Sequence, residues 1–257
     1  MRRLATDTLV IAERNLIRLP RAPELLLAFT VQPIMFVLLF RYVFGGAIHV
    51  PKGNYADFLI PGIVVQNIAF GGFVTALGLN EDVHKGLVDR FRSLPMARAA
   101  VLAGRTLADI VTNFLSIVVL VVTGLIIGFS FHTSVTHVVL GVLVLLLFGY
   151  AFSWVFAWVG LLVSTPESAN SVGFIAVFPL TFISSAFVPV HSMPTALRDF
   201  AQVNPFTITV DAMRFLWTGT EKAGNNVWGA IAWAVGIMIV FAPLAVARYR
   251  RMAAGGG

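Results

Sequence analysis

The sequence predicts an all-α polytopic membrane protein that crosses the bilayer six times, and two observations support this. First, the 257 residues are 58% hydrophobic and only 12% charged, whereas about 25% of the residues of a soluble domain are charged. Second, several apolar runs reach about 20 residues, the length that an α-helix needs to cross a hydrocarbon core of about 30 Å. The intervals between the runs reach only about 30 residues, too few for a separate soluble domain. We therefore expect residues 1–257 to form a single transmembrane domain.

Missing residue types and motifs exclude several classes of function. The chain has no cysteine, which excludes disulfides, thiolate catalysis and cysteine-ligated metals. Its histidines never form H-E-x-x-H, and no G-x-S-x-G occurs. His132 and His137 have no carboxylate or third ligand near them in the sequence, so no metal site is predicted. Asp109 is the only carboxylate well inside a predicted span, whereas aspartyl catalysis requires a pair. An intramembrane enzyme is therefore not expected.

Residues 1–21 are expected to form an amphipathic helix in the plane of the membrane surface. Apolar residues recur there at helical spacing, and arginines fall on another face, where they would meet lipid phosphates. The apolar positions are Leu9, Ala12, Leu16 and Leu19, and the arginines are Arg14, Arg18 and Arg21.

Six spans are predicted from the apolar runs. They cover residues 24–44, 58–79, 106–128, 137–163, 171–188 and 227–247. An ionisable side chain within a span is costly in lipid and should face protein or water. Asp109 lies four residues after Arg105, so an ion pair between these two is the most economical expectation.

Amide side chains within the spans are candidates for a substrate path. They are Gln32, Gln66, Asn67 and Asn113. Apolar walls that carry a few amides suit an amphipathic molecule entering from the inner leaflet. For Gln66 and Asn67 the simpler role is hydrogen bonding between helices, and substrate contact is the alternative.

A charged stretch, residues 80–95 (NEDVHKGLVDRFRSLP), lies between the second and third spans. Asn80 is expected to cap a helix that carries acidic residues in its first turn and that Pro95 ends. Four large apolar residues recur at spacings of four, four and three, which places them on one face. They are Val83, Leu87, Phe91 and Leu94. Such a helix has an apolar face to press against another protein surface, and the alternative is a solvated loop.

Residues 189–226 are predicted to form broken amphipathic helices rather than a span. Pro194 is expected at a helix start and Asn204–Pro205 at a break. The charges are few and balanced, for example Asp211 with Arg214. An outer re-entrant or interfacial helical segment before the last span is therefore predicted.

The order of the basic residues predicts the orientation of the chain. Arginines before the first span, basic residues from Lys85 to Arg105, and arginines after the last span fall on one side of a six-span chain. By the positive-inside rule, both termini and the charged stretch are expected in the cytoplasm. Because orientation accounts for the formal charge of +6, no nucleic-acid partner is predicted.

Three motifs occur in a characteristic order. The charged stretch has an acidic-then-glycine pattern and ends in D-R-x-R-x-L-P; the second span contains Pro61-Gly62-Ile63 with Gln66; and residues 193–214 contain Asn204-Pro205 and end in D-A-M-R. Together they resemble the permease subunits of type-2 ATP-binding-cassette exporters, particularly the daunorubicin-resistance-type branch. The similarity extends over nearly the whole chain.

The resemblance implies a multi-pass protein of the bacterial inner membrane in which two permeases, identical or closely related, each dock on a separate ATPase subunit. ATP and Mg²⁺ would be bound by the ATPase pair, because this chain has no G-x-x-x-x-G-K-[ST] phosphate loop. The charged stretch would be the coupling helix that carries ATPase closure into the spans. The coupling residues so implied are Glu81, Val83, Gly86, Leu87, Asp89, Arg90, Phe91, Arg92, Leu94 and Pro95.

The expected function is export of an amphipathic drug-like or lipid-like compound, and two alternatives remain open. Related permeases move lipid-linked glycans, which this sequence does not exclude. An ion-coupled secondary transporter is less favoured, because the spans carry amides where ion coupling requires buried ionisable residues.

Overall fold

The computed structural model describes residues 8, 10–13, 15, 23–46, 48, 50, 54–84, 98–220 and 226–254, and their regular elements are all helical. The longer helices are α2 (Pro23–Leu38), α3 (Tyr55–Gly71), α4 (Phe73–His84), α6 (Arg98–Ile126), α7 (Val135–Leu162), α8 (Pro166–Phe182) and α11 (Asn226–Ala254). The shorter elements are the π-helices η2 (Leu39–Phe44) and η4 (Arg214–Thr218), the 3₁₀ turn η3 (Val190–Ser192), α9 (Thr195–Val203) and α10 (Pro205–Met213).

Four of these helical stretches are long and apolar enough to cross a membrane. They are Tyr55–His84, Leu102–Ile126, Val135–Leu162 and Asn226–Met252. The first of them joins α3 to α4 through a break at Gly72. The first and fifth predicted spans correspond to shorter helices, namely α2 with η2 and the 17-residue α8. The prediction of an all-helical, multi-pass membrane protein is therefore confirmed.

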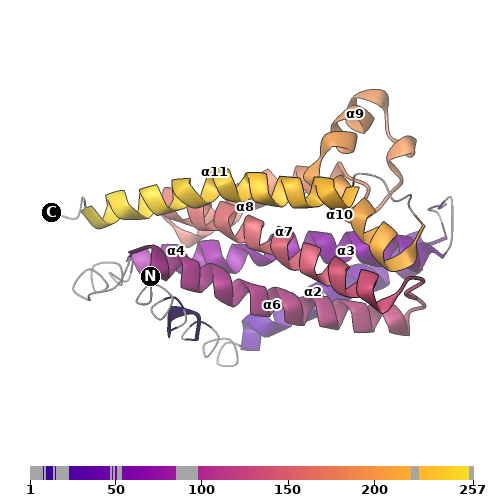
Figure 1. Ribbon diagram of the computed structural model, residues 1–257, viewed down its shortest axis with the longest axis horizontal. Helices are drawn as coiled ribbons and strands as arrows, with labels where there is room; N and C mark the ends of the chain where they lie inside the picture. Colours follow the sequence, from indigo (N-terminus) through magenta and orange to yellow (C-terminus); the bar gives the residue numbers. More distant parts are fainter. Residues whose placement is uncertain are drawn as a thin grey trace.

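The long helices lie side by side along the longest axis of the molecule (Figure 1). The helix α7 packs against α11, α4 and α6. Small residues permit the closest of these approaches: a Cβ added to Gly160 of α7 would lie 2.5 Å from the carbonyl oxygen of Ala76 in α4. The backbones of α4 and α7 are thus in direct contact, as small residues allow in membrane bundles.

The bundle has two ends, which we name for the elements found there (Figure 1). The C-terminal end carries the last turn of α4, the turn between α7 and α8, and the last turns of α11. The α9 end carries α9, α10 and the first turns of α3, α7 and α11. Since α11 has 29 residues, it is about 43 Å long and exceeds a hydrocarbon core of about 30 Å.

Part of the predicted surface helix, residues 1–21, is described, and residues 8, 10–13 and 15 are helical. Ile11 is buried and lies against α6, because a Cβ added to Gly104 would be 2.7 Å from the Cβ of Ile11. The N-terminal segment therefore packs on α6 near the C-terminal end of the bundle. The arginines expected to meet lipid phosphates, Arg14, Arg18 and Arg21, lie outside the described residues.

The predicted breaks in residues 189–226 are confirmed. The helix α9 begins directly after Pro194. Asn204 then ends α9 and caps α10, since its Oδ1 accepts a hydrogen bond from the Phe206 backbone N–H at 2.9 Å. Pro205 occupies the first position of α10, where a backbone N–H would have no partner within the helix, so the lack of an N–H in proline costs no hydrogen bond.

Candidate functional site

A cavity of about 470 Å³ lies between α2, α3, α4 and α8, within the size range of small-molecule sites. Its lining residues are Gln32, Pro33, Phe36, Ile63, Gln66, Asn67, Phe70, Phe73, Val74, Leu77, Asn170, Phe174, Phe178 and Phe182. From Asn170 to Phe182 the cavity follows α8 for about 18 Å. None of these described lining residues has an ionisable side chain.

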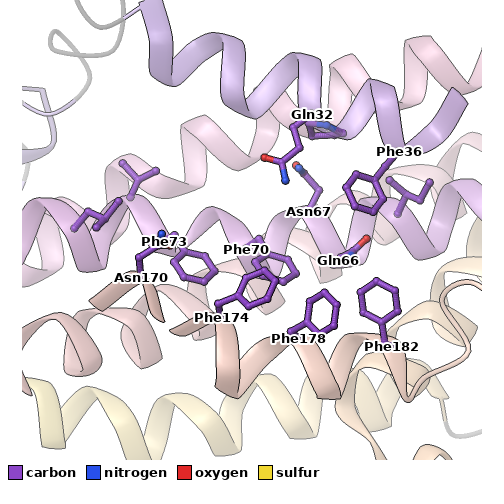
Figure 2. A pocket seen from close by; sticks show the side chains of 14 residues that line it. Gln32, Phe36, Gln66, Asn67, Phe70, Phe73, Asn170, Phe174, Phe178 and Phe182 are labelled. Atoms are coloured by element: carbon purple, nitrogen blue, oxygen red, sulfur yellow. The ribbon is translucent and has the colours of Figure 1, made fainter. Parts of the chain in front are cut away.

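Phenylalanines of α8 form one wall of the cavity (Figure 2). Phe174, Phe178 and Phe182 are spaced by four residues, so they fall on one helical face. Their rings stack in order, with centroids 4.7 and 4.3 Å apart. Phe70 of α3 lies 6.1 Å from Phe174 with its ring tilted, and it stacks on Phe73 of α4, 5.5 Å away. Flat apolar surfaces therefore line the cavity along its length.

Amides provide the polar groups of the cavity. Gln32 comes from α2, Gln66 and Asn67 from α3, and Asn170 from α8. Gln66 is 8% exposed, whereas Gln32 and Asn170 are exposed. Figure 2 shows Gln32, Gln66 and Asn67 across the cavity from the α8 phenylalanines. Among the residues that the structure describes, the site combines stacking surfaces with uncharged hydrogen-bond donors and acceptors.

The fourth predicted path residue, Asn113, does not line the cavity. It is 2% exposed and lies between two glycines: a Cβ added to Gly71 or Gly149 would lie 2.5 or 2.6 Å from its amide atoms. Its Nδ2 atom has no hydrogen-bond partner within the described residues. Asn113 thus sits in the contact between α3, α6 and α7.

The phenylalanine wall and Asn170 were not identified from the sequence. The signal was present, because Asn170, Phe174, Phe178 and Phe182 recur at intervals of four. Such a stripe is more often a buried core face than a cavity wall. What distinguishes the two is whether a neighbouring helix covers the stripe, and that depends on tertiary packing.

At the C-terminal end, the start of the charged stretch is anchored inside the bundle. Asn80 was expected to cap a helix, and this prediction is wrong, because α4 runs through it to His84. Asn80 is 1% exposed, and its Nδ2 donates to the carbonyls of Gly160 at 3.2 Å and Val163 at 2.8 Å. It therefore satisfies carbonyls that the end of α7 leaves without intrahelical partners.

Arg105 forms its ion pair with Asp82 of α4, at 2.8 Å, and not with Asp109 as predicted. Asp109 instead accepts a hydrogen bond from Thr75 Oγ1 at 2.5 Å. The reason is the close fit of α4: a Cβ added to Gly78 would overlap Nη2 of Arg105. The guanidinium thus lies directly over α4, within reach of Asp82.

Two of the implied coupling residues are described, and both are half-buried: Glu81 and Val83. Val83 packs against an apolar cluster that includes Leu79, Leu102 and Tyr249. The first residue of the apolar stripe thus contacts the helix bundle of this chain. The remaining implied coupling residues lie outside the described residues; they are Gly86, Leu87, Asp89, Arg90, Phe91, Arg92, Leu94 and Pro95.

At the α9 end, polar contacts join segments that are distant in the sequence. Nε2 of His132 lies 3.1 Å from Oδ2 of Asp57, whose Oδ1 accepts from the Ser130 backbone N–H at 3.0 Å. His132 thus does have a carboxylate beside it, which only the folded chain supplies. Within the described ranges, no three His, Cys, Asp or Glu side chains are grouped to hold a metal ion.

The balanced charges of Asp211 and Arg214 form an ion pair at 3.2 Å. Burial raises the pKa of Asp211 above its ordinary value, because desolvation outweighs the opposing effects of Arg214 and of the Ser185 hydroxyl. Arg214 is 2% exposed. A guanidinium buried to this degree requires several acceptors, and besides Asp211 they are the backbone carbonyls of Phe58 and Ser185.

Comparison with known proteins gives the family. Residues 6–216 match the ABC-2 type transporter family. The chain is 36% identical over 228 residues to the daunorubicin resistance ABC transporter permease protein DrrB1 of Streptomyces coeruleorubidus, covering 89% of this chain and 80% of that protein. It is 27% identical over 254 residues to the probable doxorubicin resistance ABC transporter permease protein DrrC of Mycobacterium tuberculosis, covering 97% and 90%.

A more distant relative is the putative transport permease ycf38 of Cyanophora paradoxa, 29% identical over 218 residues, covering 82% of this chain and 74% of that protein. The long apolar helices agree with a membrane subunit, and the sequence contains no Walker-type phosphate loop. The chain therefore belongs to the ABC-2 type transporter family and is the membrane permease of an ATP-binding-cassette exporter, not its ATPase subunit.

Proposed function

We propose that this permease exports amphipathic, drug-like or lipid-like compounds that contain a flat apolar ring system. The cavity carries this proposal, because its described lining pairs a stack of phenylalanines with uncharged amides. A planar ring stacks on the phenylalanines, at about 0.5–1.5 kcal/mol for each aromatic contact beyond area burial. Carbonyl and hydroxyl groups of the substrate bond to Gln66, Asn67 and Gln32.

The relatives support this substrate class, since two of them are named for resistance to daunorubicin and doxorubicin. The cavity volume of about 470 Å³ also suits a drug-sized molecule better than a lipid-linked glycan. Ion coupling is disfavoured, because the polar groups in the described part of the lining are amides, which do not ionise.

Six spans, with α2–η2 and α8 as the two shorter ones, complete the proposed architecture. The helix α2 and η2 together run from Pro23 to Phe44, which is long enough to cross the bilayer. Arg248, Arg250 and Arg251 extend α11 past the hydrocarbon region, so the C-terminal end of the bundle is cytoplasmic by the positive-inside rule. The α9 end, with α9 and α10 as an interfacial or re-entrant segment, faces the outside of a bacterial inner membrane.

The proposed partners are two copies of a separate ABC ATPase, which bind ATP and Mg²⁺, and a second permease, either a copy of this chain or a close paralogue. In this proposal the charged stretch, residues 80–95, is the segment that couples the permease to the ATPase, and its first residues belong to the end of α4. Its start is held firmly, since Asn80 bonds to the end of α7 and Asp82 pairs with Arg105 of α6. A movement of the coupling helix is thereby delivered to both α6 and the turn that leads into α8.

Replacing Phe178 with alanine is expected to weaken substrate binding. The substitution removes the middle ring of the α8 stack, so KM for daunorubicin should rise about threefold to tenfold. The measurement is ATP-dependent uptake into inverted vesicles that contain the permease and its cognate ATPase. Phe114→Ala is the matched control, because Phe114 is 46% exposed on α6 and does not line the cavity. Equal effects of both variants would remove the cavity from the transport path.

Replacing Gln66 with leucine is expected to change substrate preference without affecting assembly. Leucine keeps the approximate size of glutamine and removes its hydrogen bonds, each of which contributes about 0.5–1.5 kcal/mol. KM should rise for daunorubicin and stay level for an apolar dye. Gln202→Leu, at an exposed position on α9, serves as the control. A loss of permease pairing in Gln66→Leu would show instead that Gln66 is a contact between helices.

A further inference from the structure

A polar stripe runs along one face of α10 and η4. It consists of Asn204, Thr207, Asp211 and Arg214, spaced by three, four and three residues, which places them on the same side of the helix. All four side chains form hydrogen bonds with the last turn of α8 or with the residues that follow it. Arg214 also forms hydrogen bonds with α3. Such a stripe is costly in an apolar bundle unless every group is paired.

The first half of the stripe satisfies the backbone at the end of α8. Nδ2 of Asn204 donates to the carbonyls of Leu180 at 2.6 Å and Ile183 at 2.7 Å. Oγ1 of Thr207 accepts from the Ser185 backbone N–H at 3.2 Å. The last carbonyls of a helix have no intrahelical partner, so these bonds fasten α10 to the end of α8.

Arg214 joins α3 to the segment that follows α8, and α3 and α8 are two walls of the cavity. Its Nη2 donates to the Ser185 carbonyl at 2.7 Å, on the segment after α8, and to the Phe58 carbonyl at 2.9 Å, on α3. Its Nε donates to the same Phe58 carbonyl at 3.1 Å. The guanidinium also lies 3.5 Å from the centre of the Phe58 ring. Asp211 holds it in place: Oδ1 accepts from Arg214 Nη1 at 3.2 Å and from the Ser185 hydroxyl at 2.8 Å.

These two walls meet at the α9 end of the cavity. A Cβ added to Gly62 of α3 would overlap the carbonyl oxygen of Ala186, so the two backbones touch there. We call this contact between Gly62 and Ala186 the seam. Ile63, next to Gly62, and Phe182, the last residue of α8, both line the cavity. The seam therefore closes the cavity between α3 and α8 toward the α9 end.

We propose that Arg214 is a positioning residue that holds the seam closed, and that substrate leaves the cavity at the α9 end only when Arg214 releases one of the two walls. The inference rests on the proposed function, in which the α9 end is the outer one. Separating α3 from the end of α8 breaks the bonds of Arg214 to either Phe58 or Ser185. The Asp211 carboxylate keeps the guanidinium on its own helix meanwhile, ready to bridge the walls again.

The chain has no cysteine, so a single introduced thiol reports the state of the seam. Ile63→Cys is the reporter, because Ile63 is 1% exposed and lines the cavity beside the seam. Phe148→Cys is the reference, since Phe148 is fully buried and does not line the cavity. The complex with its ATPase is treated in vesicles with a membrane-impermeant maleimide from the side of the α9 end, with and without trapped ATP.

When Arg214→Met is combined with the reporter, labelling of the thiol at position 63 without nucleotide should rise at least about tenfold, as expected for the loss of charge-assisted hydrogen bonds. The thiol at position 148 should stay unlabelled, and Arg214→Lys should restore part of the protection. Arg198→Met is the matched control: Arg198 bonds to the His191 and Met193 carbonyls, within the outer segment. If the reporter stays protected in Arg214→Met, or if the reference thiol labels in parallel, the proposal is wrong.

Should Arg214→Met fail to accumulate, Asp211→Asn tests the same point, because it keeps the carbonyl acceptors of Arg214 and removes its ionic partner. Labelling of the reporter thiol should then rise less than about tenfold, again with the reference thiol protected. Unchanged labelling in Asp211→Asn would overturn the role of this pair. Labelling of the thiol does not depend on drug movement, so it tests the seam alone. Daunorubicin uptake is measured separately and tests the proposed substrate, so failure of one proposal can be told from failure of the other.

Discussion

Replacing Phe91 with aspartate is expected to abolish binding of the ATPase while leaving the permease folded in the membrane. Phe91 belongs to the apolar stripe of the charged stretch, and a carboxylate placed in an apolar interface must be desolvated without a partner. Co-purification of the tagged permease with its ATPase, followed by ATP hydrolysis, measures the effect. Retention of the ATPase at the normal ratio would contradict the assignment of this stripe to the docking surface.

Val83→Asp is the informative comparison, because Val83, the stripe residue that the structure describes, packs on the permease itself. This variant should lower the thermal stability of the permease in detergent, whereas Phe91→Asp should leave that stability unchanged. The two substitutions place the same carboxylate in one predicted apolar stripe. A loss of stability in both would mean that the whole stripe rests on the permease and that the ATPase contacts the opposite face.

Gly160→Ala is expected to destabilise the helix bundle by about 1–3 kcal/mol, the usual cost of overpacking. The added Cβ would lie 2.5 Å from the Ala76 carbonyl oxygen and 2.8 Å from the Ala76 Cα. Backbone atoms cannot move aside as a flexible side chain can, so α4 must separate from α7. The midpoint of thermal unfolding in detergent, and the ATPase activity of the complex, should both fall.

Gly236→Ala is the matched control for this prediction. A Cβ added to Gly236 of α11 meets nothing within 4 Å, so only the intrinsic helix preference changes. Alanine is favoured over glycine by about 0.5–1 kcal/mol inside a helix. This variant should therefore be as stable as the parent or slightly more so. Equal destabilisation in both variants would mean that the closeness of α4 and α7 does not limit stability.

At the cavity, the amide side chains were predicted from the sequence and the phenylalanine wall was not. Gln32, Gln66 and Asn67 were found because an amide within an apolar run is conspicuous in the sequence. The phenylalanines of α8 line the same cavity and yet are ordinary residues for a membrane span. Asn113, chosen by the same reasoning as the other amides, is buried between Gly71 and Gly149. Which amide faces a cavity is decided by the neighbouring helices.

The ion pairs also show which contacts local sequence spacing predicts and which depend on helix packing. Arg105 and Asp109 are four residues apart on α6, and local spacing favoured their pairing. The guanidinium nevertheless bonds to Asp82, since α4 packs across it at Gly78. The sequence showed Asp211 and Arg214 only as balanced charges, and in the structure they form an ion pair, since they lie three residues apart on adjacent turns. Their hydrogen bonds to Phe58 and Ser185 depend on chain segments that are distant in the sequence.

By itself, the sequence determined the helical class, the membrane location, the family resemblance and the breaks at Pro194 and Asn204. These properties follow from composition, from periodicity and from local backbone chemistry, each of which acts over a few residues. Only the tertiary structure decided that Asn80 binds the end of α7, that α8 forms a cavity wall, and that Arg214 bridges α3 and the end of α8. Those contacts form between residues that are far apart in the sequence, so their partners are set by how the helices pack.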